Sequence, residues 1–261
     1  MTTRLDDKVA LITGASSGIG AKTAILFSKL GSKLTLCGRN VENLEAVAKQ
    51  CEEVSPEGLK PFLVVVNDLT NKEDTKRLLN ESMEHYKTLD ILVNNAGILL
   101  TGSVQDLSME KYDLQTNVNV RAVYHLTKIC IPYLIASKGN IVFVSSVAGL
   151  RSFPNIAAYC MSKSAIDHFC RCLALELAPQ QVRVNCVNPG VIKTECHLRY
   201  SMDEEKYKEF LKHAKETHAL GRYGEAEEVA NAIAFLASDG ASFITGATLP
   251  VDGGRSVMCP R

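Results

Sequence analysis

A tyrosine and a lysine in the second half of the chain could carry out proton transfer. Tyr159 and Lys163 stand four positions apart in a stretch with helical periodicity, so their side chains lie on one face of a helix. A free phenol has a pKa near ~10 and is a weak base at neutral pH. A neighbouring ammonium favours the phenolate and lowers that pKa. The spacing therefore predicts that Tyr159 acts as a general acid and base.

Two serines precede this pair. Ser145 and Ser146 end an apolar run, and Ser146 stands thirteen positions before Tyr159. In parallel sheets ligands bind at the carboxyl ends of the strands, where a serine hydroxyl could hold a carbonyl oxygen as charge develops on it. Serine pairs and Tyr-x-x-x-Lys pairs are each common and mostly structural, so the prediction depends on their occurring together with a nucleotide-binding motif upstream.

A glycine-rich turn supplies that motif. Gly14, Gly18 and Gly20 follow the apolar segment 9–13 and precede a helical pattern. Glycines at such a turn let the backbone approach a diphosphate at the helix N-terminus, where unpaired N–H groups favour anions. Glycine-rich turns also occur for packing reasons, and the position directly after the first strand is what favours a dinucleotide.

The end of the second strand indicates which dinucleotide binds. An acidic residue there would bind the ribose 2′-hydroxyl of NAD, whereas a basic residue suits the 2′-phosphate of NADP. This chain has Arg39 and Asn40 at that point and no acid before Glu42. Arginine offers paired, charge-assisted hydrogen bonds to a phosphate, so we expect NADP(H) rather than NAD(H). The alternative is a solvated arginine at the start of a helix.

Strand-like and helix-like segments that could position these residues alternate along the whole chain. Unbroken apolar runs predict seven strands, at 9–13, 34–37, 62–66, 89–93, 141–145, 182–187 and 247–251. Helical spacing predicts helices at 20–30, 41–54, 71–86, 119–137 and 155–178. This order is typical of a doubly wound parallel α/β sheet of the Rossmann type, and with no linker we expect one domain over residues 1–261.

Residues 193–222 interrupt the alternation. Charge is dense there, and insertions at the carboxyl ends of sheet strands commonly cover ligands, so we expect a substrate lid. A solvated surface excursion is the alternative. His213 and His218 lie in this segment, and we expect them on a solvated helix face.

Composition excludes several classes of protein. Lys and Arg number 29 and Asp and Glu also number 29, so no basic excess favours nucleic acid. No apolar run approaches the ~18 residues of a membrane span, and we expect neither a secretory signal nor a membrane partner. The nine cysteines are scattered, which favours small buried side chains in a reducing, cytoplasmic setting. His and Cys show no ligand spacing, so no metal is expected.

Taken together, the motifs resemble the short-chain dehydrogenase/reductase family, in its single-domain branch. The resemblance extends from Lys8 to Gly254. It is carried by Thr13-Gly14-x-x-x-Gly18-x-Gly20, Asn94-Asn95-Ala96-Gly97, Ser146, Tyr159-x-x-x-Lys163, Asn188-Pro189-Gly190 and the segment 243–254.

The resemblance implies direct hydride transfer between a nicotinamide and a carbonyl carbon, with Tyr159 moving the alcohol proton. Lys163 would hold the nicotinamide ribose, and the family spacing selects Ser146 over Ser145 as the residue that binds the substrate oxygen. Asn119 resembles the family's fourth catalytic residue, which kinks its helix and holds a water in a proton relay. Asn117 is the rival for that role.

The resemblance, with the glycine turn, also implies the cofactor contacts and the assembly. The expected contacts are Gly14, Ser16, Ser17, Gly18, Ile19, Gly20, Arg39, Asn40, Asp68, Leu69, Asn95, Ala96, Gly97, Tyr159, Lys163, Pro189, Gly190, Val191, Ile192 and Thr194. Helices 119–137 and 155–178 pair between subunits in the family, so a homotetramer is expected, with a dimer second.

The expected substrate is an apolar ketone or secondary alcohol, such as a steroid, terpenoid or lipid-derived carbonyl compound. The segments expected to face it, 97–102 and 148–153, carry apolar residues, although pockets are mostly apolar in any case. Arg151, Arg199 and Arg222 leave a phosphorylated or carrier-bound substrate open. The alternatives are a 3-oxoacyl-carrier reductase and a non-catalytic NADP-binding sensor.

Overall fold

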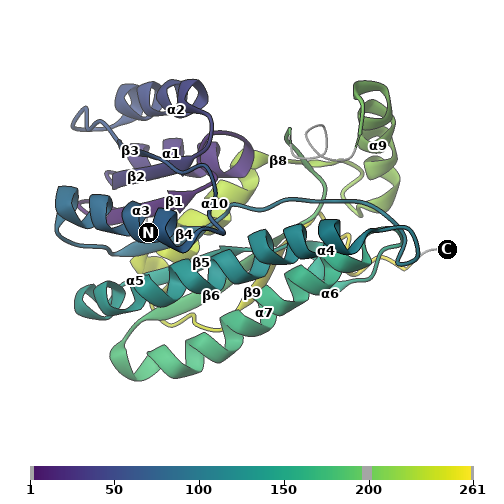
Figure 1. Ribbon diagram of the computed structural model, residues 1–261. Helices are drawn as coiled ribbons and strands as arrows, with labels where there is room; N and C mark the ends of the chain where they lie inside the picture. Colours follow the sequence, from purple (N-terminus) through teal and green to yellow (C-terminus); the bar gives the residue numbers. More distant parts are fainter. Residues whose placement is uncertain (1–2, 196–201, 260–261) are drawn as a thin grey trace.

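The computed structural model describes residues 3–195 and 202–259, which form one seven-stranded sheet with helices on both faces (Figure 1). The strands are β1 (Val9–Thr13), β2 (Lys33–Gly38), β3 (Phe62–Val65), β4 (Ile91–Asn94), β5 (Asn140–Val144), β6 (Arg183–Pro189) and β9 (Thr248–Val251). Their order is β3-β2-β1-β4-β5-β6-β9, and every neighbouring pair is parallel. The predicted doubly wound α/β sheet is therefore confirmed.

Two apolar layers separate the sheet from its helices. Helices α1 (Gly18–Lys29), α2 (Val41–Val54) and α10 (Ala226–Ala237) pack on one face, and α3 (Lys72–Tyr86), α5 (Val123–Ser137) and α7 (Ala157–Leu177) on the other. Alternation along the strands supplies both layers, because Ala10 and Ile12 of β1 face the first set of helices while Leu11 faces the second. This two-sided burial explains the unbroken apolar runs.

The helix predicted from residue 119 begins ten residues earlier. It consists of α4 (Met109–Thr116), a π-helical segment η1 (Asn117–Ala122) and α5. Ser108 caps it, its side chain accepting a hydrogen bond from the Lys111 N–H. In α4 Gln115 is the buried residue, so this part lacks the apolar periodicity that marks a packed helix.

Two further helices were not predicted. Helix α10 starts with a capping box formed by Glu225 and Glu228, in which a glutamate replaces the serine or threonine that usually signals a helix start. The short helix α6 (Val147–Leu150) follows directly on Ser146, whose side chain caps it. Short 3₁₀ turns, η2 (Ala178–Gln180) and η3 (Asp239–Ala241), follow α7 and α10.

The predicted lid region contains helix α9 (Glu204–Thr217), which stands away from the sheet in Figure 1. Strands β7 (Ile192–Lys193) and β8 (Gly224–Glu225), which flank it in the chain, pair with each other. His213 is exposed and pairs with Glu216, as expected for a solvated face. His218 contradicts the same expectation, because it is only 3% exposed. Cys196, His197 and Arg199 lie outside the described residues.

The described cysteines are unbridged. Cys37, Cys51, Cys130, Cys170 and Cys186 are buried, in agreement with the expectation of small core side chains, whereas Cys172 and Cys259 are exposed. Across residues 3–195 and 202–259, none of the helices combines the length and the apolar character needed to cross a bilayer.

Candidate active site

A cleft of about 270 Å³ opens at the carboxyl ends of the central strands. Residues that end or directly follow β1, β2, β3, β4, β5 and β6 line it. The sheet order reverses between β1 and β4, because the chain builds outward from β1 in one direction and from β4 in the other. Ligands of open α/β sheets bind at such a switch point.

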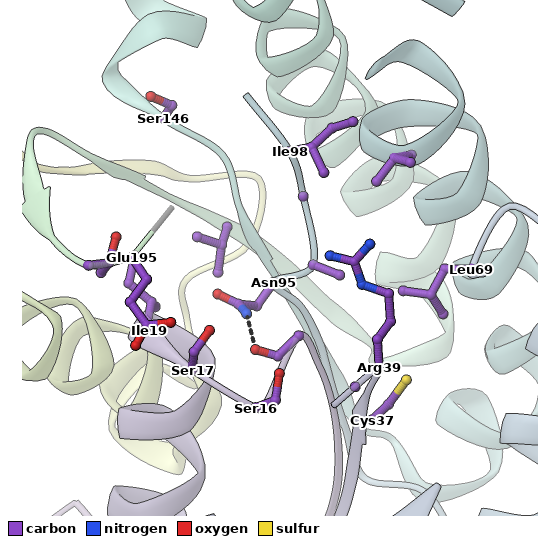
Figure 2. Close-up of a pocket in the computed structure, with 18 of the residues that line it drawn as sticks. Ser16, Ser17, Ile19, Cys37, Arg39, Leu69, Asn95, Ile98, Ser146 and Glu195 are labelled. Carbon is purple, nitrogen blue, oxygen red and sulfur yellow. Dashed lines mark hydrogen bonds between the residues drawn. The ribbon is translucent and has the colours of Figure 1, made fainter. Parts of the chain in front are cut away.

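The glycine turn forms one end of the cleft. A Cβ on Gly14 would lie 2.8 Å from Asn95 Nδ2, and a Cβ on Gly20 would lie 2.3 Å from the Gly14 oxygen. Asn95 Nδ2 donates to the Thr13 carbonyl oxygen at 2.9 Å. It also donates to the Gly14 carbonyl oxygen at 3.2 Å, the bond drawn in Figure 2. Helix α1 begins directly behind the turn, and its N-cap, Ser17, makes no side-chain capping bond. The N–H groups of the first turn are thus available to a diphosphate, which this cradle fits.

Arg39 lies directly after β2. It is exposed and lines the cleft together with Asp68 and Leu69. Figure 2 shows its side chain extending from the end of β2 with the guanidinium beside the cleft. Asp68 uses its carboxylate to accept the N–H and hydroxyl of Thr70. An arginine at this point fits a 2′-phosphate on the adenosine ribose.

Tyr159 and Lys163, both from α7, also line the cleft. Lys163 is 6% exposed, and its Nζ lies 5.6 Å from the centroid of the Tyr159 ring. The same Nζ donates to the Val144 carbonyl oxygen at 2.9 Å, which ties α7 to the end of β5. The structure therefore brings together the two residues that the spacing placed on one helix face.

The two serines do different things. Ser145 Oγ donates to the Lys163 carbonyl oxygen at 3.1 Å and is buried. Ser146 Oγ accepts the Ala148 N–H at 3.1 Å and so caps α6. Because the Ser146 hydroxyl oxygen accepts in this bond, the Ser146 O–H can still donate a hydrogen bond to the oxygen of a bound substrate. This difference favours Ser146 over Ser145 as the substrate-binding serine.

Asn119 lies in the π-helical segment and is 1% exposed. Its Oδ1 accepts the Ile98 N–H, and its Nδ2 donates to the Ile98 carbonyl oxygen, both at 2.9 Å. A Cβ on Gly97 would lie 3.2 Å from Asn119 Oδ1 and 3.5 Å from Lys163 Nζ, so the amide and the ammonium both adjoin Gly97. Asn117, the rival, is only half-buried.

Four predicted site residues do not line the cleft. Asn40 instead caps α2, its Oδ1 accepting the Asn43 N–H at 2.7 Å. Gly20 packs behind the turn against Gly14, and Asn119 hydrogen-bonds the backbone of Ile98, which itself lines the cleft. Val191 is buried and donates its N–H to His218 Nε2 at 3.1 Å. The other predicted contacts line the cleft.

Ile98, from the segment 97–102 that was expected to face the substrate, lines the cleft. Sequence reasoning missed several other residues that line it: Cys37, Gly38, Val66, Asn67, Val118, Val144, Ser145 and Glu195. Most stand beside a predicted contact at a strand end, and that position is the signal that could have found them. Burial raises the pKa of Cys37 to about 12, which keeps it a thiol.

Comparisons with known proteins agree with this fold. Residues 14–256 match a family model described as enoyl-(acyl carrier protein) reductase. A 3-oxoacyl-(acyl-carrier-protein) reductase of Thermotoga maritima is 36% identical over 96% of this chain and 98% of its own length. The solved structure of a short-chain dehydrogenase/reductase of unknown function from Caenorhabditis elegans, with cofactor, superposes with a TM-score of 0.91 at 35% identity, over 98% of this chain and 97% of that one. The 3-ketoacyl-(acyl-carrier-protein) reductase of Brucella melitensis, solved with NADH, gives a TM-score of 0.87 at 33% identity, over 97% of this chain and all (100%) of that one.

Proposed function

Because the chain belongs to the short-chain dehydrogenase/reductase family, we propose that it is an NADP(H)-dependent oxidoreductase that interconverts an apolar ketone and its secondary alcohol. Oxidoreduction at a CH–OH group follows from family membership. The observation that carries the proposal is that Ser146, Tyr159 and Lys163 line one cleft with the glycine turn.

A bound nicotinamide dinucleotide would supply or accept the hydride. Gly14, Gly18 and the first turn of α1 would hold its diphosphate, and the segment from Pro189 to Thr194 would adjoin the nicotinamide end. Ser146 Oγ would donate a hydrogen bond to the carbonyl oxygen and orient it, keeping its own proton. Tyr159 would give that oxygen a proton during reduction and take one during oxidation. The Lys163 cation, close to the Tyr159 ring, favours the phenolate.

The preference for NADP(H) rests on Arg39. Its guanidinium, beside the cleft in Figure 2, would pair with a 2′-phosphate, and the first acidic residue after β2 is Glu42, already inside α2. Apparent Michaelis constants for NADPH and NADH test this preference. We expect Arg39→Ala to raise the constant for NADPH at least tenfold and to leave that for NADH within threefold. A native preference for NADH would overturn it.

The apolar substrate class rests on apolar side chains in the cleft. Ile98, Val118 and Val144 are among the residues that line it. The two described arginines that left an anionic substrate open have partners within the chain, since Arg151 donates to the Ser256 carbonyl oxygen and Arg222 pairs with Glu228. Screening ketones, steroids and terpenoid aldehydes with NADPH, read at the cofactor's absorbance, tests the class.

Tyr159→Phe tests catalysis itself. The variant keeps the ring and loses the hydroxyl, so we expect turnover to fall at least 1,000-fold, in the upper range of losses for general acid–base groups, while NADPH binding stays within threefold. Equal turnover by the variant would exclude the proton-transfer role. A native protein that binds NADPH and reduces no carbonyl compound would favour the sensor.

A 3-oxoacyl-carrier reductase is the second candidate, favoured by the name of the Thermotoga maritima relative. Acyl carriers are acidic, and a basic cluster made of Lys72, Lys76, Arg121 and Lys128 surrounds His125, where burial and these charges lower the His125 pKa. Rates with a carrier-bound 3-oxoacyl group and with the same group on a small thiol separate the two. Carrier dependence that Lys128→Glu abolishes would favour the carrier reductase.

We also propose a homotetramer in the cytoplasm. The exposed faces of α5 and α7 carry Tyr124, Met161 and Leu175, which are 53%, 58% and 80% exposed, and a symmetric partner would cover them. The buried, unbridged cysteines suit a reducing compartment. Light scattering tests the assembly, and a mass near 28.5 kDa at micromolar concentration would contradict it.

A further inference from the structure

A buried carboxylate lies behind the proposed catalytic residues, and the mechanism above does not use it. Asp167 is one helical turn beyond Lys163, so Tyr159, Lys163 and Asp167 form a single row along α7. Asp167 is 2% exposed. Aspartate is rarely buried without partners that hold it in one place, so its contacts are informative.

Asp167 accepts its hydrogen bonds from β6. Asn188 Nδ2 lies 2.9 Å from Asp167 Oδ1 and 3.0 Å from Oδ2, and Cys186 Sγ lies 3.3 Å from Oδ1. The carboxylate also packs against Gly149 of α6, where a Cβ would stand 2.2 Å from Oδ2. A side chain at residue 149 would therefore displace the carboxylate, which explains the glycine there.

Asn188 links Asp167 to Ser146 by hydrogen bonds. The same Nδ2 donates to the Ser146 carbonyl oxygen at 3.0 Å, and that oxygen also accepts the Gly149 N–H at 2.9 Å. Asn188 directly precedes Pro189, which lines the cleft. The cluster thus joins the tyrosine helix, the serine turn and the strand that leads to the nicotinamide end.

The carboxylate also decides which way the Asn188 amide points. Among the described residues, no group donates to Asn188 Oδ1, which is buried. The amide is therefore oriented by what its nitrogen donates to, and Asp167 takes one of the two hydrogens while the Ser146 carbonyl takes the other. Without an acceptor at residue 167, a rotated amide would turn its oxygen toward the Ser146 carbonyl oxygen and repel it.

We propose that Asp167 is a positioning residue, whose carboxylate orients the Asn188 amide so that it holds Ser146, and with it the Ser146 hydroxyl, at the right distance from Tyr159. This inference rests on the proposed function for its effect on turnover. Misplacing a catalytic group by about 1 Å can reduce the rate about 100-fold, so a small shift of the serine turn is enough to be measured.

The test is a double-mutant cycle between Asp167→Leu and Ser146→Ala. Leucine is similar in size and accepts no hydrogen bond. We expect Asp167→Leu to lower kcat 10- to 100-fold in the native background, with KM for the cofactor within threefold, and to lower it less than threefold in the Ser146→Ala background. Asp167→Asn keeps one acceptor oxygen and should recover part of the rate.

Cys170→Ala is the matched control, since Cys170 is buried on the same helix but donates to the Val184 carbonyl oxygen rather than to Asp167, and it should leave kcat within twofold. Equal losses from Asp167→Leu in both serine backgrounds, or no loss in the native one, would overturn the inference. Should Asp167→Leu not fold, Asn188→Ala removes the linking amide, and the same cycle with Ser146→Ala decides in the same way.

Amide hydrogen exchange separates this inference from the proposed function. Asp167→Leu should speed exchange in a peptide spanning residues 145–151, which contains the Ala148 and Gly149 N–H groups, and Cys170→Ala should not. A native protein that reduces no carbonyl compound overturns the proposed function. Unchanged exchange in this peptide overturns the positioning role, whatever the activity.

Discussion

Replacing Gly20 with alanine tests the diphosphate site most directly. Helix propensity alone would make the alanine variant more stable, whereas the clash with neighbouring residues would make it less stable. Gly20 lies in the first turn of α1, where alanine is favoured over glycine by about 0.8–1 kcal/mol. The alanine Cβ would nevertheless stand 2.3 Å from the Gly14 oxygen and 2.5 Å from Asn95 Nδ2. Since the Gly14 oxygen is a backbone atom, the glycine turn that forms the diphosphate site must itself move.

The size of the effect follows from the bonds at stake. Asn95 Nδ2 would lose its hydrogen bonds to the Thr13 and Gly14 carbonyl oxygens. A lost bond costs about 1 kcal/mol, and a buried group left unpaired costs about 1–3 kcal/mol. After the helix-propensity gain, we expect Gly20→Ala to lower the free energy of unfolding by about 2–4 kcal/mol. That corresponds to a fall in Tm of roughly 5–15 °C.

Gly20→Ala should also weaken NADPH binding, which a loss of stability elsewhere in the chain would not do. A displaced turn misaligns N–H groups that bind a charged diphosphate, and one such bond contributes about 1.5–3 kcal/mol, so NADPH should bind about 10- to 100-fold more weakly by calorimetry. Gly58→Ala is the control, because Gly58 has φ +63° and no atom within 4 Å of its Cβ position. It should cost about 1–2 kcal/mol of stability through left-handed strain and leave NADPH affinity unchanged. A Gly20→Ala protein with native affinity would refute the steric argument.

Two further changes test other parts of the site. Burial lowers the pKa of His218 below its ordinary value of 6.5. As the pH falls below 6.5, the unfolded chain therefore binds a proton at this residue more readily than the folded chain does. The stability that neutral His218 contributes is present above pH 6.5 and is lost as the pH falls below it. Urea unfolding between pH 7.5 and 5.5 should show a shallower loss for His218→Gln than for the native chain, and equal slopes would contradict this. Asn119→Ala leaves the buried N–H and carbonyl oxygen of Ile98 without their partner, at about 1–3 kcal/mol each, and should lower Tm and turnover. The half-buried Asn117 should tolerate alanine, and a larger loss there would reverse the assignment.

The sequence was sufficient wherever neighbouring residues determine the outcome. The alternation of apolar runs with segments of helical spacing predicted the parallel sheet. Each pattern shows which side chains of a segment must be buried, and this does not depend on which element the segment packs against. The four-residue spacing placed Tyr159 and Lys163 on one face of α7, and the glycine turn was readable because its conformation is local. Helices α4 and α10 were not predicted, because the residues that start them are weak or unusual signals and part of their surface is polar.

Only the tertiary structure decided how distant segments meet. The burial of His218, which the sequence suggested was solvated, depends on the segment after β6, where the Val191 N–H donates to His218 Nε2. The different uses of Ser145 and Ser146, and the contact of Asp167 with Asn188, likewise join residues about 20 positions apart on different elements. Such hydrogen bonds leave no periodic trace in the sequence, because a polar residue is buried only where a partner from another element arrives to pair with it.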